Sequence, residues 1–261
     1  SLEAALVAAE AGLPVGFMTM ASCASTGPAT LAGNLVVGNV EVLSALVLLQ
    51  MAYPGCPVYY AAALTATDLR TGAYTGGGPA DYLFGAATNL LADFYRLPLS
   101  MGAFATGAKQ PDWQAGVDNS LSAFMAASTG ADMLLGAGLL HGSRIFSYEE
   151  LLMDSEIWNM LCTTLRGIVV DDETLALEVI RQVGPGGHYL AHRHTLKHMR
   201  ELWQPTLMDR RPYSVWEQKR DGAREWAREK AQKILREHPG RPLEDGLRSE
   251  LMKIITLAEQ L

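Results

Sequence analysis

The sequence of 261 residues predicts an α/β fold built from parallel strand–helix units, of the TIM-type (β/α) barrel class. Three observations support this fold class. Four short apolar runs recur along the chain, a helical pattern follows each run, and a polar loop joins each run to its helix. Strands that alternate with helices in this way pair in parallel through right-handed crossovers. An open doubly wound sheet is the competing architecture at this point.

Each apolar run is expected to form a buried strand. Three of the four runs begin with proline, which suits the first residue of a strand. Both alternating sets of positions are apolar, as in strands that are covered on two faces. The runs span residues 14–20, 57–62, 98–104 and 133–139.

Helical patterns fill the segments between the runs, and residues 2–11 add a helix ahead of the first strand. Pro79 lies near a helix start, and Gly55 follows a helix end. Ser147 and Glu150 have the spacing of a capping box, with Ser147 at the N-cap and Glu150 at the third helical position. The expected helices span residues 29–52, 79–96, 114–130 and 147–166.

The loops that follow the strands favour a barrel over an open sheet. Each loop is polar and most are rich in glycine or threonine, and the chemistry of a barrel is built from such loops at the carboxyl ends of its strands. No dinucleotide-binding or phosphate-binding glycine motif accompanies them, since the glycines of residues 75–78 lack a following Lys. Eight units take ~250 residues. The four units found here therefore form half of a larger barrel, or two copies complete each other.

Charge divides the chain into two parts. Residues 1–192 have a net charge of −11, whereas residues 193–261 have a net charge of +4. We therefore expect a half-barrel body over residues 1–205 and a helical tail over residues 206–261, with tail helices near 213–237 and 243–260. The overall charge of −7 argues against nucleic acid as a partner, because phosphate backbones require a basic face.

The longest apolar stretch, residues 31–51, is a poor candidate for a membrane span. It contains Asn34, Asn39 and Glu41, whose polar side chains are costly in a bilayer. The pattern instead predicts a helix that is buried in the protein. The three cysteines of the whole chain, Cys23, Cys56 and Cys162, are widely separated and odd in number, so no disulfide framework is expected. A reducing, cytoplasmic location follows as an expectation.

Two of the loops carry several candidate site residues. Asp68 follows the second strand, where its carboxylate either binds a cation or pairs with Arg70 and stiffens the loop. Lys109, Asp112 and Gln114 follow the third strand. Asp112 has a second interpretation as the N-cap of the next helix. We expect catalytic roles for Lys109 and Asp112 and a substrate-binding role for Asp68 and Gln114.

His141 follows the fourth strand and is the third candidate catalytic residue, although a lone histidine is more often a structural hydrogen-bonding group. Aromatic rings near the strand ends are candidates for holding a quaternary ammonium by cation–π attraction, with core packing as the alternative for each ring. These rings are Tyr59, Tyr60, Phe104, Trp113 and Phe146.

The histidines between His188 and His198 are the one motif typical of a metal site. His188 and His192 are four residues apart, as are His194 and His198. Zinc requires a further Cys or carboxylate ligand at a suitable spacing, and none lies nearby. The glycines of residues 184–187 also indicate a loop ahead of the run. We therefore expect no metal.

A set of short motifs, in this order, resembles the C-terminal half of the trimethylamine methyltransferase family of corrinoid-dependent enzymes. The resemblance covers residues 1 to about 220. The motifs lie at residues 28–33, 39–44, 108–116, 136–138, 146–150, 171–176, 183–188 and 207–211.

The resemblance implies a TIM barrel and the transfer of a methyl group from a methylated amine to the Co(I) of a separate corrinoid (cobalamin) protein, with no tightly bound cofactor. Some family members carry pyrrolysine just before a Lys-x-Pro-Asp segment, and Ala105 matches that position. The resemblance is thus to a non-pyrrolysine member, which favours glycine betaine and similar quaternary amines over trimethylamine. The alternative is a betaine-binding half-barrel without turnover, or a truncated fragment of the enzyme.

A half-barrel has two open sheet edges and an uncovered inner face. Both features favour association, so we expect a homo-oligomer.

Overall fold

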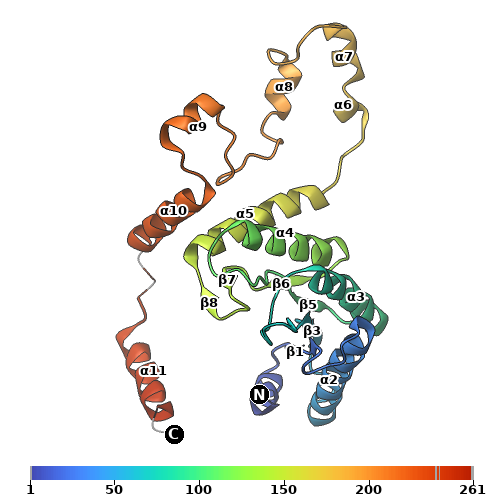
Figure 1. Cartoon of the computed structure of the whole chain (residues 1–261), viewed down its shortest axis with the longest axis vertical. Coiled ribbons are helices and arrows are strands. Elements are labelled where there is room, and N and C mark those ends of the chain that lie inside the picture. Colours follow the sequence, from blue (N-terminus) through green and yellow to red (C-terminus); the bar gives the residue numbers. More distant parts are fainter. Residues whose placement is uncertain (1, 239, 241, 260–261) are drawn as a thin grey trace.

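The computed structural model describes residues 2–238, 240 and 242–259. Its centre is a parallel sheet of four strands in the order β1-β3-β5-β6, as Figure 1 shows. The predicted set of four parallel units is confirmed. The strands are β1 (Val15–Thr19), β3 (Val58–Ala62), β5 (Leu99–Gly102) and β6 (Met133–Leu135).

Helices cover one face of this sheet. α2 (Leu31–Ala52) packs on β1 and β3, α3 (Pro79–Tyr95) packs on β5, and α4 (Trp113–Ser128) packs on β6. α1 (Leu2–Glu10) precedes the sheet, and α5 (Tyr148–Leu165) packs on α4. The side chains between the sheet and the helices include Tyr60, Leu99 and Met101, each at most 2% exposed.

Two short strand pairs extend the loops beyond the sheet. β2 (Ser22–Cys23) pairs in parallel with β4 (Thr65–Ala66), and β7 (Leu139–Leu140) forms an antiparallel hairpin with β8 (Ile145–Phe146). The fourth strand is shorter than predicted. It ends at Leu135 because Gly136, at φ +108°, turns the backbone out of the extended conformation.

Within the residues that the structure describes, no helix covers the second face of the sheet. A row of side chains crosses this face in register: Met18 pairs with Ala61, Ala61 with Ser100, and Ser100 with Met133. Met18 is 37% exposed and Met133 is 49% exposed. We call this side of the sheet the open face. Within the described residues β1 and β6 are edge strands, so closure of the barrel stays a prediction.

α2 is the one described helix that is long and apolar enough to cross a membrane by length and composition alone, with a mean hydropathy of 1.9. The core helix of a soluble protein meets the same criterion. One side of α2 faces the sheet, where Gly38, Val42 and Leu49 are buried, and Asn34 on that side donates to the carbonyl of Ala21.

The helix caps explain where α4 and α5 begin. The carboxylate of Asp112 accepts the backbone N–H groups of Gln114 and Ala115, and the hydroxyl of Ser147 accepts that of Glu150. The predicted capping box is only half correct. The Glu150 side chain does not reach back to the cap, because it is fully buried against α4.

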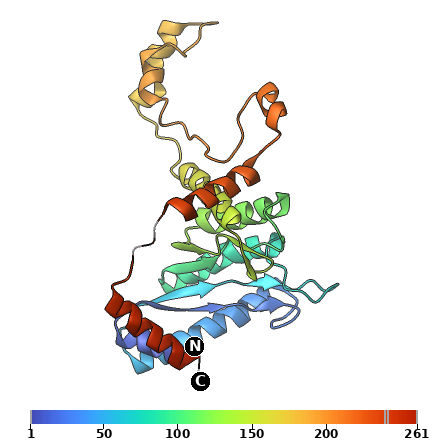
Figure 2. The same ribbon diagram turned by 90° about the vertical axis from the view of Figure 1, so that its left-hand side faces the viewer.

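Beyond α5 the chain leaves the sheet as an extended arm and returns as a tail (Figure 2). The predicted helix over residues 213–237 is divided in two, because Arg220 takes a left-handed conformation at φ +55°. The arm and tail helices are α6 (Asp172–Leu175), α7 (Leu177–Val183), α8 (Arg193–His198), α9 (Tyr213–Lys219), α10 (Ala223–Glu237) and α11 (Asp245–Ala258).

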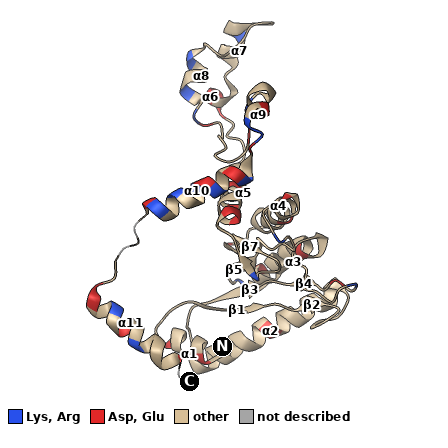
Figure 3. Cartoon of the chain, turned by 60° about the vertical axis from the view of Figure 1, so that its left-hand side comes forward, with Lys and Arg blue, Asp and Glu red and all other residues tan. Residues whose placement is uncertain are grey.

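α10 packs on α5, where Ala227 is fully buried, and Arg228 pairs with Glu149 of α5 at 3.1 Å. None of the described side chains of α11 is buried. Figure 3 shows mixed charges along α10 and α11, whereas α2 is almost free of charge.

Arg211 fixes the turn into α10. Its guanidinium binds the carboxylates of Asp209 and Asp221 at 2.7 and 2.8 Å and lies over the Trp226 ring at 4.6 Å. Upstream of it, Glu156 of α5 accepts hydrogen bonds from the backbone N–H and the hydroxyl of Thr206 and from the N–H of Leu207. These contacts attach the returning chain to the body.

Candidate functional site

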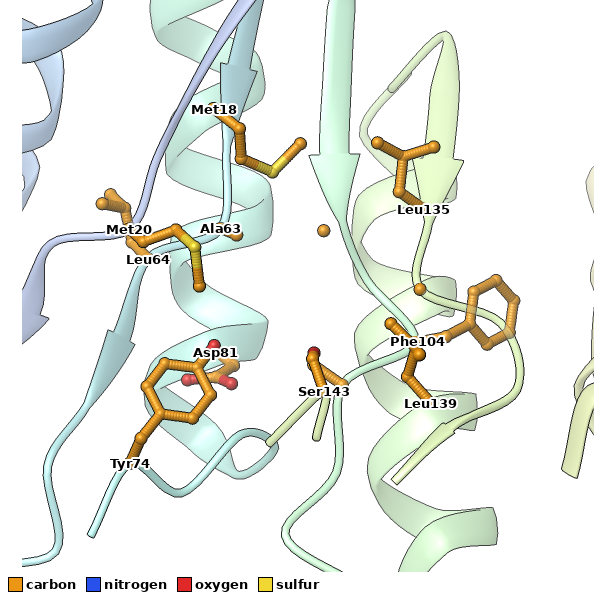
Figure 4. Close-up of a pocket in the computed structure, with 13 residues that line it drawn as sticks. Met18, Met20, Ala63, Leu64, Tyr74, Asp81, Phe104, Leu135, Leu139 and Ser143 are labelled. Atoms are coloured by element: carbon orange, nitrogen blue, oxygen red, sulfur yellow. The ribbon is translucent and has the colours of Figure 1, made fainter. Parts of the chain in front are cut away.

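A cavity of about 210 Å³ lies at the carboxyl ends of the strands (Figure 4). Apolar side chains form most of its wall, and one carboxylate, that of Asp81, lines it. Figure 4 shows Asp81 beside the ring of Tyr74 on one side, with Phe104 and Leu139 on the other side. The lining residues are Met18, Met20, Ala63, Leu64, Tyr74, Asp81, Gly102, Phe104, Ala105, Leu135, Gly136, Leu139 and Ser143.

Asp81 lies in the first turn of α3, two residues after Pro79 starts the helix. One carboxylate oxygen accepts the hydroxyl of Thr65 at 2.7 Å, and the other accepts the backbone N–H of Gly77 at 2.7 Å. The side chain is therefore held from β4 and from the glycine-rich loop. Its position is thus set by the loop directly ahead of the helix and by a strand sixteen residues upstream.

Burial dominates the electrostatics of Asp81 and raises its pKa to about 7, although the hydrogen bonds from Thr65 and Gly77 act in the opposite direction. Burial also raises the pKa of the neighbouring Tyr74 to about 12, with a further contribution from the charge of Asp81. At neutral pH the phenol therefore keeps its proton, while Asp81 is close to half ionised. A bound cation would shift Asp81 to its ionised form.

The glycine-rich loop that holds Asp81 has little room for side chains. Gly76, Gly77 and Gly78 have φ values of +60°, +81° and +95°. A Cβ atom at Gly77 would lie 2.4 Å from the carboxylate carbon of Asp118, which is itself buried and accepts the Thr106 hydroxyl at 2.8 Å. Glycine is thus required both by the backbone conformation and by the close approach of α4.

Comparison with known proteins decides the family. A family model described as trimethylamine methyltransferase (MTTB) matches residues 1–259. The chain belongs to the trimethylamine methyltransferase family.

Two relatives illustrate the range of names within this family. A glycine betaine methyltransferase of Desulfitobacterium hafniense is 37% identical over 256 residues, which are 97% of this chain and 53% of the relative. A trimethylamine methyltransferase of Methanosarcina barkeri is 35% identical over 252 residues, which are 95% of this chain and 50% of the relative. The chain spans about half the length of these relatives.

Two of the predicted site positions line the cavity. Phe104 is 4% exposed, belongs to the main hydrophobic core and lines the cavity, and Ala105, the position that matches pyrrolysine in some members of the methyltransferase family, lies next to it. The structure therefore brings the predicted aromatic position and the pyrrolysine-matching position together in one cavity.

The other predicted aromatic residues lie elsewhere. Tyr59 is near the amino end of β3, where its ring covers Gly16. Tyr60 faces the helices and donates its hydroxyl to Asn39, so it lies outside this cavity. Trp113 is 81% exposed at the start of α4, and Phe146 is 52% exposed on β8.

The predicted charged and polar residues also lie outside the cavity lining. Lys109 is exposed and donates to the carbonyl of Gly107 at 2.5 Å. Asp112 has the helix-capping role that the sequence analysis weighed as its alternative. Gln114 reaches Asp118 at 3.4 Å, and His141 donates its backbone N–H to Ala108 at 2.7 Å.

Asp68 stiffens its own loop through the main chain, because its carboxylate accepts the N–H of Arg70 at 2.7 Å. The histidine run is divided as expected, with His188 in a loop and His194 and His198 on α8. Over the part of the chain that the structure describes, no three His, Cys, Asp or Glu side chains form a group that could hold a metal ion.

Sequence reasoning missed Asp81, Tyr74 and the methionines of the cavity. The signal for Asp81 was present, since it follows three glycines and a proline in a loop after a predicted strand. Acidic residues are common in the first turn of a helix because they interact favourably with the helix dipole. The place of Asp81 in the sequence therefore did not by itself indicate a binding site.

Proposed function

We propose that the cavity binds the ammonium group of a quaternary methylated amine, and that in the complete catalytic unit one methyl group passes to the Co(I) of a corrinoid protein. The observation that carries this proposal is a single buried carboxylate in an otherwise apolar cavity at the carboxyl ends of the strands. Family membership supports the reaction class.

The cavity matches the chemistry of a quaternary ammonium. Such a cation cannot donate a hydrogen bond, so it needs a counter-charge and apolar contact for its methyl groups. Asp81 supplies the charge, and Met18, Phe104 and Leu139 supply the contact. The Tyr74 ring lies beside Asp81 in Figure 4 and would add cation–π attraction of about 0.5–2 kcal/mol.

Ala105 favours a quaternary over a tertiary amine. Neutral trimethylamine is a poor methyl donor until its nitrogen gains a fourth bond, and the methyl side chain of Ala105 supplies neither a proton nor an electrophile. The nitrogen of a quaternary amine is already positive and departs as a neutral amine. The site then has only to hold the cation and orient one methyl group.

Cobalt belongs to the partner corrinoid protein, which accepts the methyl group as the second substrate. Asp81, Phe104 and their neighbours would hold the amine, while the mouth of the cavity at the strand ends is where the partner would approach. No Lys or Arg occurs among the described residues that line the cavity, so the lining itself selects for the ammonium group.

The test is methylation of a Co(I) corrinoid protein with glycine betaine and trimethylamine side by side, using the complete catalytic unit. Turnover of glycine betaine with little turnover of trimethylamine is expected. Efficient turnover of trimethylamine with Ala105 in place would contradict the argument from the missing electrophile. Binding of glycine betaine without turnover of either amine would favour a binding module.

A further inference from the structure

Three fully buried side chains lie between α4 and α5, behind the wall of the cavity. They are Asn119 of α4 and Glu150 and Asp154 of α5, and each is 0% exposed. The proposed methyl transfer makes no use of them. Burying two carboxylates side by side is costly unless their charge is neutralised, so the cluster needs a physical explanation.

The hydrogen bonds of this cluster are incomplete. The Asn119 amide donates to Glu150 Oε1 at 2.9 Å and to Asp154 Oδ1 at 2.8 Å. The other oxygen of Asp154 accepts the backbone N–H of Gly138 at 2.8 Å. Glu150 Oε2 and Asn119 Oδ1 each have no hydrogen-bond partner among the described residues. The cluster therefore holds two acceptors without a donor, and one of them belongs to a carboxyl group.

Among the described residues, the charged groups around the cluster offer no cation that could donate a hydrogen bond to Glu150. Asp112, at the start of α4, disfavours ionisation of Glu150. On the side of α10, Arg228 pairs with Glu149. The remaining carboxylate of this part of α5, Glu156, is bonded to Thr206 and Leu207.

A proton held by the carboxyl groups of Glu150 and Asp154 is the simplest source of a hydrogen-bond donor. Burial, followed by the charge of Asp154, raises the pKa of Glu150 to about 8, and burial raises that of Asp154 to about 6. The two groups titrate as a pair. Both shifts favour a proton held by the pair, in agreement with the unpaired Glu150 Oε2.

We propose that Glu150 and Asp154 share one proton in the folded chain, and that this shared proton keeps Asp154 in position to fix the segment of residues 136–139 in the cavity wall. Glu150 and Asp154 are positioning residues, because neither lines the cavity.

The connection to the cavity runs through Gly138. Its neighbours Gly136 and Leu139 line the cavity, and its own N–H binds Asp154. Gly138 has φ +83°, and a Cβ atom there would lie 2.9 Å from the ring of Phe146 and 3.0 Å from Cβ of Leu151. The segment is therefore tightly packed, and Asp154 holds its backbone from behind.

The sign of the pH effect follows from the shared proton. As the pH rises through about 8, the proton leaves for solvent and two buried negative charges remain in contact. Their repulsion separates Glu150 from Asp154 and weakens the hydrogen bond from the Gly138 N–H to Asp154. The cavity wall is thus ordered below this pH and loosens above it.

The decisive experiment is amide hydrogen exchange of residues 136–139 in the full chain between pH 6 and 9, corrected for intrinsic exchange. In the wild type we expect protection to fall by up to about tenfold per pH unit above the titration of the pair. Glu150→Gln should keep the protection at all pH values, because its amide permanently donates to Asp154. Asp154→Ala, which removes the acceptor of the Gly138 N–H, should lose protection throughout. Glu149→Gln, next in sequence and partly exposed, should follow the wild type.

A wild-type pH dependence that persists in Glu150→Gln would overturn the proposal. Should that variant not fold, infrared spectroscopy of the chain with Asp81→Asn gives an independent measurement, since this background removes the other buried carboxyl group that titrates near neutrality. A carboxylic acid carbonyl band at pH 7 is expected, and its absence would equally overturn the proposal. Neither measurement uses a substrate, so both outcomes are independent of the proposed methyl transfer.

Discussion

At the scale of single residues, the proposed cation site makes ligand binding depend on the ionisation of Asp81. Burial raises its pKa to about 7, and a cation binds to the ionised form. We therefore predict that the affinity for tetramethylammonium rises by up to about tenfold per pH unit below 7 and levels off above that pH. Calorimetric titration from pH 5.5 to 8.5 measures this. An affinity that does not change with pH would show that Asp81 is not the counter-charge.

For the ligand-free chain the sign is reversed. A raised pKa means that the folded state binds its proton more tightly than the unfolded state does, so the contribution of Asp81 to stability is lost as the pH rises through about 7. Saturating tetramethylammonium should restore stability at pH 8 and have little effect at pH 5.5. Thermal unfolding at the two pH values, with and without the cation, tests this expectation.

Asp81→Asn and Asp112→Asn are a matched pair of substitutions. The first removes the only carboxylate among the described cavity residues and should weaken binding of tetramethylammonium at least about tenfold. The second leaves a good N-cap for α4, because asparagine caps helices as well as aspartate does, and should leave binding and melting temperature nearly unchanged. The opposite outcome would restore Asp112 as the binding carboxylate that the sequence analysis favoured.

At the scale of elements, the glycine-rich loop between β4 and α3 is fixed by space as well as by conformation. Gly72 and Gly77 both have positive φ, but a Cβ atom meets nothing within 4 Å at Gly72 and meets Asp118 at 2.4 Å at Gly77. Gly72→Ala should therefore cost only the strain of the left-handed conformation, about 1–2 kcal/mol. Gly77→Ala should cost clearly more and also weaken cation binding. Equal losses in denaturant unfolding would show that the packing against Asp118 is unimportant.

The tail offers a second test at this scale. Arg211 binds two carboxylates and stacks on Trp226, whereas Arg210 lies over Trp203 at 5.3 Å and donates to the Trp203 carbonyl at 3.4 Å. Lysine cannot reproduce the planar, forked contact of arginine. Arg211→Lys should therefore release α10 from α5 and increase proteolysis of the tail, while Arg210→Lys should not. Rapid cleavage near Arg211 in the wild type would instead indicate a solvated tail.

Elements were more predictable from sequence than the orientation of their side chains. The strands and main helices followed from apolar runs, prolines and the caps at Asp112 and Ser147. The face on which each strand side chain lies could not be predicted, because Tyr59 and Tyr60 look alike in an apolar pattern. Only packing decides which of the two rings contacts the helices. The glycines and the proline ahead of Asp81 mark its position in the sequence, but its burial and its contact with Thr65 depend on the folded chain.

At the scale of the whole molecule, the open face predicts association. Met18, Met133 and Leu135 are 37–49% exposed on a sheet with two edge strands. We expect the chain to form a dimer or larger oligomer that buries more than ~1,200 Å². Light scattering coupled to gel filtration measures this, and a monodisperse monomer would contradict it. Met18→Glu should weaken association, whereas Leu69→Glu, in the exposed loop after β4, should not.

The row of side chains across the open face also limits what can cover it. Its two outer positions, Met18 and Met133, are flexible and adapt to different neighbours, whereas its two inner positions, Ala61 and Ser100, are small. The Ser100 hydroxyl is buried and has no hydrogen-bond partner among the described residues. Because Ala61 and Ser100 are each 1% exposed, neighbouring side chains already shield the centre of the row, and a covering layer meets the two outer methionines first. The contact surface of such a layer is therefore set at the two edges of the sheet, by side chains that can change shape to fit it.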